Sequence, residues 1–323
     1  MKGTLVISID VEFAWGLVNL PISAADYAQI SAEREAIRRM LALFKTYNIR
    51  ATWALVGHLL RSTIEVKGGR AVPEMPRPVM RDETRDWFAH LVDAPREAWC
   101  APDAVELIRT AQPEQEIGSH SFGHVLYDER AANADAIAAD VQLAKQAHMA
   151  HGVPFESFVF PCNCIGFKHM LRDAGVRAYR GHTPRWYDGV RPYALWRMMN
   201  LLTHMLGIRP PLVSAEVDDC GLVNVPDSML LYHRQGLRRL ITPWAQARMA
   251  RRGLDAAVRQ GTMFHLWFHP SNIACRMDEQ CALLERILRH AQALIQRGAL
   301  ENATMGELAH RFNTTPENGN ADS

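Results

Sequence analysis

The sequence lacks paired cysteine motifs, long hydrophobic runs and an excess of charge of either sign. None of the six cysteines forms a Cys-x-x-Cys pair; they stand at positions 100, 162, 164, 220, 275 and 281. A chain of 323 residues can bury a large core without disulfide bonds, so we expect the reduced thiols of a cytoplasmic protein. Because the formal net charge is only +1, no overall attraction to nucleic acid is expected.

The N-terminus contains only a short apolar run. Leu5 to Ile9 is followed at once by Asp10, whereas a signal peptide needs a longer apolar core and a small-residue cleavage site. No uninterrupted apolar run approaches the ~20 residues of a membrane span. We therefore expect a cytoplasmic protein without a transmembrane segment, in at most weak peripheral contact with the inner face of the membrane.

Strand patterns alternate with helix patterns, most clearly in the first half of the chain. The strand patterns occupy residues 5–9, 51–56, 116–119, 158–160, 177–180 and 262–268. The helix patterns occupy residues 31–47, 102–110, 135–151, 168–174 and 278–297. This alternation predicts an α/β fold with a parallel sheet or barrel, in which functional side chains lie at the carboxyl ends of the strands.

The second half of the chain is less regular. Residues 185–255 contain an apolar helix pattern at 195–206, and we interpret them as a helical insertion. A Pro- and Gly-rich stretch at 67–81 predicts a long surface loop. We expect a single domain over residues 1–312 and a polar, disordered tail over 313–323.

Two histidines follow the predicted strand at 116–119. His120 and His124 can reach one metal ion if the backbone between them makes about one helical turn, and Gly123 leaves room for that turn. The alternative is an ordinary loop histidine with a cap partner. A hydrolytic metal needs a third ligand, and a mixed nitrogen and carboxylate set suits zinc best, with cobalt, nickel or iron as substitutes.

Two acids follow the first strand pattern. Asp10 and Glu12 lie on one face of the strand if the chain stays extended. One carboxylate would then bind the metal and the other would act on the attacking water. The alternative is a helix cap or a salt bridge at a strand end. The functional interpretation depends on this pair meeting the two histidines in space.

Two further strand ends carry reactive groups. His269 follows an aromatic-rich strand and precedes Pro270, which disfavours helical geometry; it is either a general acid or a satisfied histidine at a barrel rim. Pro161 and Cys162 follow the strand at 158–160. There we expect the backbone N–H to matter and not the thiol, because the sequence fixes no basic partner for a nucleophilic cysteine or a soft-metal Cys-x-Cys site.

Five segments together resemble the motifs of the polysaccharide deacetylase superfamily, the NodB-homology or carbohydrate esterase family 4 group. They are Ser8–Glu12, Ala51–Gly57, His120–His124, Phe160–Asn163 and Leu266–Pro270. The third matches the His-Ser/Thr-x-x-His motif, and the first is similar to the motif usually written TFDDG. The resemblance covers most of the chain and implies a distorted (β/α)7 barrel of the NodB type that holds one divalent metal.

The resemblance also implies a role for each site residue. Asp10 would be the general base, and His120 and His124 would bind the metal. His269 would be the general acid, and the N–H of Cys162 would help to hold the oxyanion. The implied reaction is the metal-assisted hydrolysis of an amide.

The sequence departs from the family pattern at two positions. Val11 replaces the second aspartate of the first motif and cannot bind metal, so we assign the third ligand to Glu12. The arginine of the loop at Phe160–Asn163, which orients the base in the family, is also missing. Arg180 is our candidate replacement, and Asp227 is our candidate for the acid that tunes the last histidine.

The expected substrate is an N-acyl, most simply N-acetyl, amino sugar. Because a cytoplasmic enzyme cannot reach finished wall polymers, we predict a nucleotide- or lipid-linked precursor of surface polysaccharide, such as O-antigen or exopolysaccharide. The arginine-rich segment 234–252 would bind its phosphate through Arg238 and Arg239, the alternative being a solvated basic helix face.

Two other functions remain open. One is the hydrolysis of a non-sugar amide or an N-formyl group, as in the allantoinase-like and deformylase-like branches of the superfamily. The other is a carbohydrate-binding protein whose catalytic site has decayed, for which the missing arginine and second aspartate argue.

Overall fold

The computed structural model describes most of the chain. It covers residues 2–18, 22–63, 95–130 and 132–313, and the backbone alone of 65–67 and 70–72. Most of the loop predicted at 67–81, and the tail predicted at 313–323 beyond Asn313, lie outside the described residues. In the described part, no helix is both long and apolar enough to cross a membrane.

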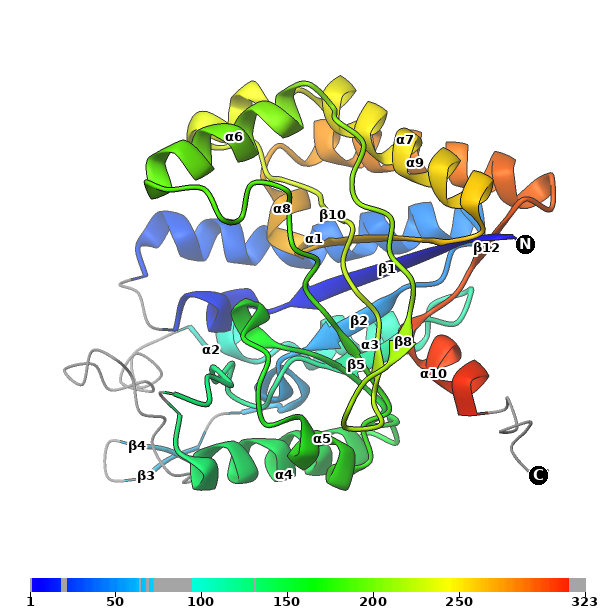
Figure 1. The fold of residues 1–323 in the computed structure, drawn as a ribbon. Coiled ribbons are helices and arrows are strands. Elements are labelled where there is room, and N and C mark those ends of the chain that lie inside the picture. Colours follow the sequence, from blue (N-terminus) through cyan, green and yellow to red (C-terminus); the bar gives the residue numbers. More distant parts are fainter. Residues whose placement is uncertain are drawn as a thin grey trace, which may run out of the picture.

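A curled, mostly parallel sheet forms the centre of the molecule (Figure 1). Neighbouring strands run parallel in the order β10–β11–β1–β2–β5–β6–β7–β9, and β8 adds an antiparallel edge. The main strands are β1 (Gly3–Val11), β2 (Thr52–Leu55), β5 (Glu116–Ser119), β6 (Ser157–Val159), β7 (Ala178–Arg180) and β11 (Met263–Phe268). The shorter ones are β8 (Glu216–Val217), β9 (Val223–Asn224), β10 (Met229–Leu230) and β12 (Leu300–Asn302), which pairs with the start of β1. A separate hairpin joins β3 (Glu65–Lys67) to β4 (Arg70–Val72).

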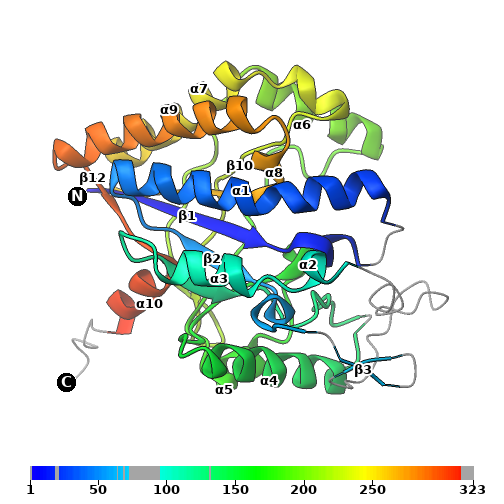
Figure 2. The same ribbon diagram turned by 180° about the vertical axis from the view of Figure 1, so that it is seen from behind.

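Helices cover the outer face of this sheet, and Figure 2 shows α1 lying across β1 with α9 and α3 on either side. The long helices are α1 (Ala24–Tyr47), α4 (Ala134–Ala150), α6 (Tyr193–Met205), α7 (Pro243–Gln260) and α9 (Met277–Gln296). The shorter ones are α2 (Arg96–Trp99), α3 (Pro102–Arg109), α5 (Lys168–Ala174), α8 (Pro270–Ala274) and α10 (Met305–Asn313). Single 3-10 turns include η1 (Phe13–Leu17), η2 (Gly57–Leu60), η4 (Pro161–Asn163) and η5 (Gly236–Leu240).

Strand β1 lies in the interior of the sheet, and all of its residues except Thr4 are buried. Leu5, Ile7 and Ile9 pack into the larger hydrophobic cluster, whereas Val6 packs into a second cluster on the other face. Burial on both faces explains the unbroken apolar run in the sequence. In the ladder, Ile9 pairs with Phe268, so Asp10 and His269 leave the sheet at the same edge.

The segment 185–255 contains more than the helices we expect from the sequence. Helix α6 lies near the predicted range, but β8, β9 and β10 also fall in this segment, and β9 and β10 extend the main sheet. Each of these strands has two residues, which is too short for an alternating pattern to show in the sequence.

Candidate active site

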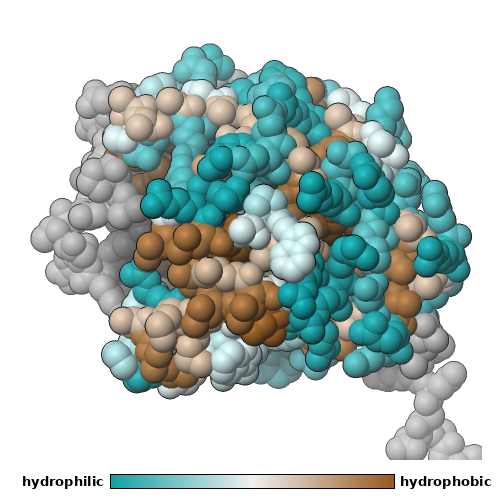
Figure 3. Space-filling model, turned by 90° about the horizontal axis from the view of Figure 1, so that it is seen from above, coloured by the Kyte–Doolittle hydropathy of each residue, from teal (hydrophilic) through white to brown (hydrophobic). Residues whose placement is uncertain are grey.

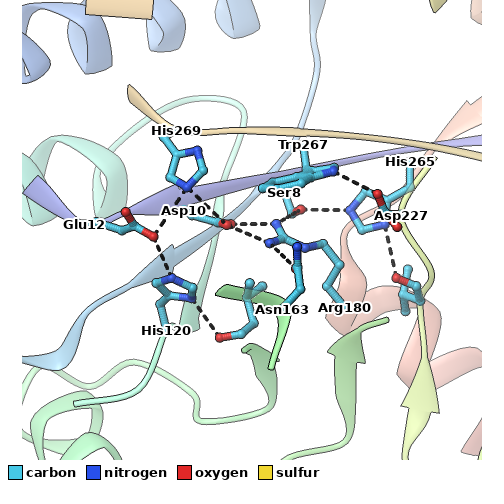
Figure 4. Close-up of polar contacts among 12 residues, drawn as sticks. Ser8, Asp10, Glu12, His120, Asn163, Arg180, Asp227, His265, Trp267 and His269 are labelled. Atoms are coloured by element: carbon cyan, nitrogen blue, oxygen red, sulfur yellow. Dashed lines mark hydrogen bonds and ion pairs between the residues drawn. The ribbon is translucent and has the colours of Figure 1, made fainter. Parts of the chain in front are cut away.

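The predicted site residues converge at the carboxyl ends of the parallel strands (Figure 4). Asp10 and Glu12 come from the end of β1, and His120 follows β5 directly. Arg180 ends β7, and His269 follows β11. Residues far apart in the sequence therefore surround one small volume, as the strand alternation predicts.

Glu12 lies between the two histidines of the His-x-x-x-His segment. Its Oε1 atom is 2.9 Å from Nε2 of His120 and 3.1 Å from Nε2 of His124. Burial alone would raise the pKa of Glu12, but the neighbouring histidines hold it well below its usual value. Glu12 is therefore a carboxylate that points inward, toward both imidazoles.

The donor set fits a divalent metal. Nδ1 of His120 lies 2.8 Å from the carbonyl oxygen of Val159, and since a carbonyl only accepts, Nδ1 carries the proton. The other ring nitrogen, Nε2, faces Glu12 and is the one that would bind a metal, as in histidines that bind zinc. Tetrahedral ligands about 2.1 Å from zinc stand about 3.4 Å apart, slightly wider than the distances here. Glu12, His120 and His124 thus offer three ligands to one ion.

The loop that carries the histidines is held in an unusual backbone conformation. Ser121 and His124 have positive φ values of 67° and 55°, which side-chain-bearing residues rarely adopt. The carboxylate of Asp140 on α4 accepts hydrogen bonds from the backbone N–H groups of Phe122 and Gly123 and from the hydroxyl of Ser121. This fully buried acid fixes the turn that brings both imidazoles to the same side.

Asp10 is paired with a buried guanidinium. Nη1 and Nη2 of Arg180 donate to the two oxygens of Asp10 at 2.6 and 2.7 Å, a bidentate geometry. Both side chains are almost fully buried, at 2% and 1% exposure. Burial would raise the pKa of Asp10, but the charge of Arg180 brings it below the usual value, so the carboxylate stays ionised.

Arg180 is itself fixed by its surroundings. Its guanidinium lies 4.2 Å from the ring centroid of Trp267 and donates to Ser8 and to the side chain of Asn163. Asn163 comes from the loop after β6, where the family pattern has its arginine. The guanidinium that orients the acid thus comes from the next strand in this chain.

His269 faces both acids from the opposite side. Its Nε2 atom is 3.4 Å from Glu12 and 3.8 Å from Asp10. Burial would lower the pKa of His269, but the two carboxylates raise it to about 9. Nδ1 lies 3.2 Å from the side-chain oxygen of Asn272, which also accepts from the backbone N–H of His269.

The structure corrects our prediction for Asp227. Its carboxylate accepts from the guanidinium of Arg185, the backbone N–H of Thr183 and the indole N–H of Trp267, and it lies 3.4 Å from Nδ1 of His182. Asp227 therefore orients the ring that stacks on Arg180, and Asn272 occupies the place beside Nδ1 of the last histidine. Our prediction places the partner of His269 on another segment of the chain, whereas Asn272 is only three residues after the histidine.

The turn after β6 has positive φ at both Cys162 and Asn163, and Pro161 at its start is buried. Burial, with a smaller contribution from Glu12, raises the pKa of the Cys162 thiol to about 11. A thiol this basic is protonated at neutral pH, which argues against a nucleophilic cysteine.

A cavity of about 240 Å³ opens beside these residues. Its lining combines Asp10, Glu12 and His269 with His233 and with Glu33 from α1. A larger hollow of about 460 Å³, around Arg50 and Glu116, holds none of the site residues.

Glu33 is an acid that the sequence analysis does not single out. Burial raises its pKa to about 8, and the charge of Glu12 adds to the effect. The cavity thus contains a carboxyl group that is largely neutral near pH 7.

Comparison with known proteins supports the fold. No family model matches the sequence, and a search of the curated proteins finds no match. A structure assigned as a polysaccharide deacetylase from Mycobacterium smegmatis superposes with a TM-score of 0.65 at 16% identity, over 100% of this chain and 95% of that chain. Another, assigned likewise from Pseudomonas aeruginosa, gives 0.59 at 12% identity, over 97% and 91% of the two chains. This chain has the polysaccharide deacetylase fold.

The deacetylase fold does not by itself fix the activity. A 4-alpha-glucanotransferase from Thermococcus litoralis also superposes, with a TM-score of 0.54 at 10% identity, over 97% of this chain and 41% of that chain. The resemblance seen in the sequence is therefore confirmed at the level of the distorted barrel, and the chemistry has to be argued from the side chains.

Sequence reasoning missed Asp140 although a signal was present. In α4, the buried residues Ile137, Asp140, Val141 and Ala144 share one helix face. An acid on the apolar face of an amphipathic helix indicates a buried hydrogen-bonding role.

Proposed function

We propose that this protein is a metal-dependent deacetylase that hydrolyses the N-acyl group of an amino sugar. The observation that carries the proposal is the convergence of three groups: the Glu12–His120–His124 donor set, the Asp10–Arg180 pair and His269. The fold adds support, because two structures assigned as polysaccharide deacetylases share it.

Each residue has a role that its environment favours. A divalent metal held by Glu12, His120 and His124 would supply Lewis acidity to the amide carbonyl. Asp10, kept ionised and aligned by Arg180, accepts the proton of the attacking water.

The same environment suits His269 to the acid role. His269, whose pKa is raised by the acids, carries the proton that the departing nitrogen needs. The backbone N–H of Cys162 helps to hold the developing oxyanion. Because the proposed general base Asp10 still has a guanidinium partner in Arg180, the site favours an active enzyme over a decayed one.

The substrate we propose is an amino sugar joined to a phosphate, as in a nucleotide- or lipid-linked precursor of surface polysaccharide. The cavity of about 240 Å³ suits one sugar ring and its acyl group. Arg238 lies next to this cavity, because its Nη1 is 3.2 Å from Nε2 of His233 on the cavity wall. Arg239 is also exposed, and its backbone carbonyl oxygen accepts a hydrogen bond from Arg234.

A matched pair of variants tests the phosphate site. With a phosphorylated N-acetyl amino sugar, R238E should raise KM about tenfold with little change in kcat, because a charge-assisted contact to phosphate is lost. R239E is the control and should change KM much less. An unchanged KM in R238E would remove the phosphate site.

A product assay separates the proposal from its alternatives. The purified, metal-loaded protein should release acetate from N-acetyl amino sugars. Formate or a ureide product, with no acetate, would instead assign the protein to a deformylase-like or allantoinase-like activity.

A further inference from the structure

Helix α6 exposes its apolar side chains and buries polar ones. The buried residues of this helix are Thr203 and His204. By contrast, Tyr193 is 65% exposed, Met198 is 49% exposed and Leu202 is 44% exposed. A helix that packs against a protein core shows the reverse pattern, so this face is not explained by the fold.

The exposed apolar surface continues beyond α6. The groove between α6 and residues 232–241, about 430 Å³ in volume, has Met198 on one wall and Leu237 on the other. We call the exposed apolar set the α6 face; it comprises Trp186, Tyr193, Met198, Leu202, Leu206, Leu237, Leu240 and Trp244. The view from above shows apolar residues gathered in one area, bordered by hydrophilic ones (Figure 3).

The same segments carry positive charge without any acid. The sequence has no Asp or Glu between Asp188 and Glu216, or between Asp227 and Asp255. The exposed arginines of these two stretches are Arg191, Arg197, Arg209, Arg238, Arg239, Arg248, Arg251 and Arg252. Arg248 and Arg252 donate to carbonyl oxygens at the end of α6, so this charge lies directly beside the apolar surface.

The α6 face adjoins the mouth of the candidate active site. Arg238 contacts His233, and the side chains of His233 and Asn272 lie 3.3 Å apart. Asn272 in turn binds His269. A chain of contacts therefore links the exposed surface to the proposed general acid.

We propose that the α6 face docks on a membrane surface that contains anionic lipids. Protein surfaces that bind at the membrane–water interface combine Trp, Tyr and aliphatic side chains with arginine. Their apolar groups enter the headgroup boundary, and their cations bind lipid phosphate. A second copy of this chain is a poorer occupant, since it would bring the same positively charged arginines face to face.

Docking would bring the cavity beside His233 to the level of the lipid headgroups. A sugar phosphate anchored in the bilayer would then reach Asp10 and His269 without leaving the membrane. This last step rests on the proposed deacetylase function, whereas the docking itself does not.

Vesicle flotation tests the docking. The wild-type protein should float with phosphatidylcholine vesicles that contain phosphatidylglycerol, bind pure phosphatidylcholine vesicles much less, and dissociate as salt rises. The double variant M198E/L202E should bind about tenfold more weakly or worse. R197E should weaken binding at least about fivefold.

Three controls make the result decisive. M149E changes an exposed methionine on α4, 67% exposed and outside the α6 face, and should bind as the wild type does. D10N should float normally although inactive, so failed docking and failed deacetylation are distinguishable. Unchanged melting temperatures would show that the variants fold.

Three results would overturn the proposal. The first is the absence of wild-type binding to the anionic vesicles. The second is a loss of binding in M149E equal to that in M198E/L202E. The third is a wild-type dimer in light scattering that M198E/L202E dissociates without any vesicle binding, which would assign the face to self-association.

Discussion

The orientation of Asp10 depends on one guanidinium that the family pattern places elsewhere. Arg180 approaches from β7 and binds both oxygens of the acid, while Trp267 stacks on its other side. This bidentate geometry keeps the carboxylate both ionised and aligned. Lysine carries the same charge but a single ammonium group, so it cannot reproduce the geometry.

We therefore expect R180K to lower kcat about 10- to 100-fold, the usual effect of removing a partner that orients a site residue. Metal content measured by emission spectroscopy should stay unchanged, because Arg180 does not contact the Glu12 donor set. R177K, at a half-exposed position near the same strand, is the matched control and should keep full activity. Wild-type kcat in R180K would show that Asp10 is not the base.

The sequence predicts the site residues that directly follow a recognisable strand pattern. Asp10 and Glu12 end one apolar run, and His120 and His124 follow another, so strand ends locate all four. Arg180 is only a guess from sequence, and Asp140 is not found, because a contact between separate elements depends on how the helices and strands pack.

At the scale of elements, α4 and the loop after β5 form one unit. Asp140 accepts from Ser121, Phe122, Gly123 and the hydroxyl of Tyr127. These hydrogen bonds offset the free-energy cost of the positive φ values at Ser121 and His124. The helix thus fixes the conformation of the loop that carries His120 and His124.

Replacing the acid by its amide should loosen this loop. D140N places an NH2 group where donors converge, which leaves hydrogen bonds unmade and should cost about 1–3 kcal/mol of stability. Zinc affinity should fall about 10- to 100-fold. Urea unfolding and zinc titration measure the two effects, and D135N, at an exposed position of the same helix, is the control. Equal zinc affinity in D140N and D135N would contradict the positioning role.

Element boundaries were predictable where local signals are strong. Helix α5 matches its predicted range because Gly175 closes it with a positive φ. Helix α1 begins at Ala24 instead of Ser31 because Ser23 and Asp26 form a capping box ahead of the apolar pattern. The two-residue strands β8, β9 and β10 were not predictable, since tertiary pairing alone defines such short segments.

For the molecule as a whole, several buried histidines must be neutral for the fold to be stable. Burial lowers the pKa of His148, His204 and His265 to about 4 in each case. Unfolded histidines titrate near 6.5, so the unfolded chain binds more protons between these values. The stabilising contribution of these three histidines should therefore be complete above about pH 6.5 and be lost as the pH falls toward 4.

His148 provides a direct test of this pH dependence. Its burial is complete, and its Nδ1 contacts the carbonyl oxygen of Pro154 at 3.0 Å. H148Q removes one titrating group, so the loss of unfolding free energy between pH 7 and pH 5 should be smaller by about 1–2 kcal/mol. H151Q, at the exposed end of the same helix, should leave the wild-type slope. Equal slopes in all three proteins would mean that His148 does not carry this effect.

The fold accommodates different activities, as its likeness to a glucanotransferase shows. The proposed function therefore depends on different roles for two acids at the end of β1, with Glu12 as a metal ligand and Asp10 as the proton acceptor. Metal content and turnover, measured together in D10N and E12Q, test this most directly. We predict that D10N keeps a full equivalent of zinc without turnover and that E12Q loses both. A D10N protein that turns over, or an E12Q protein that keeps its zinc, would contradict the account.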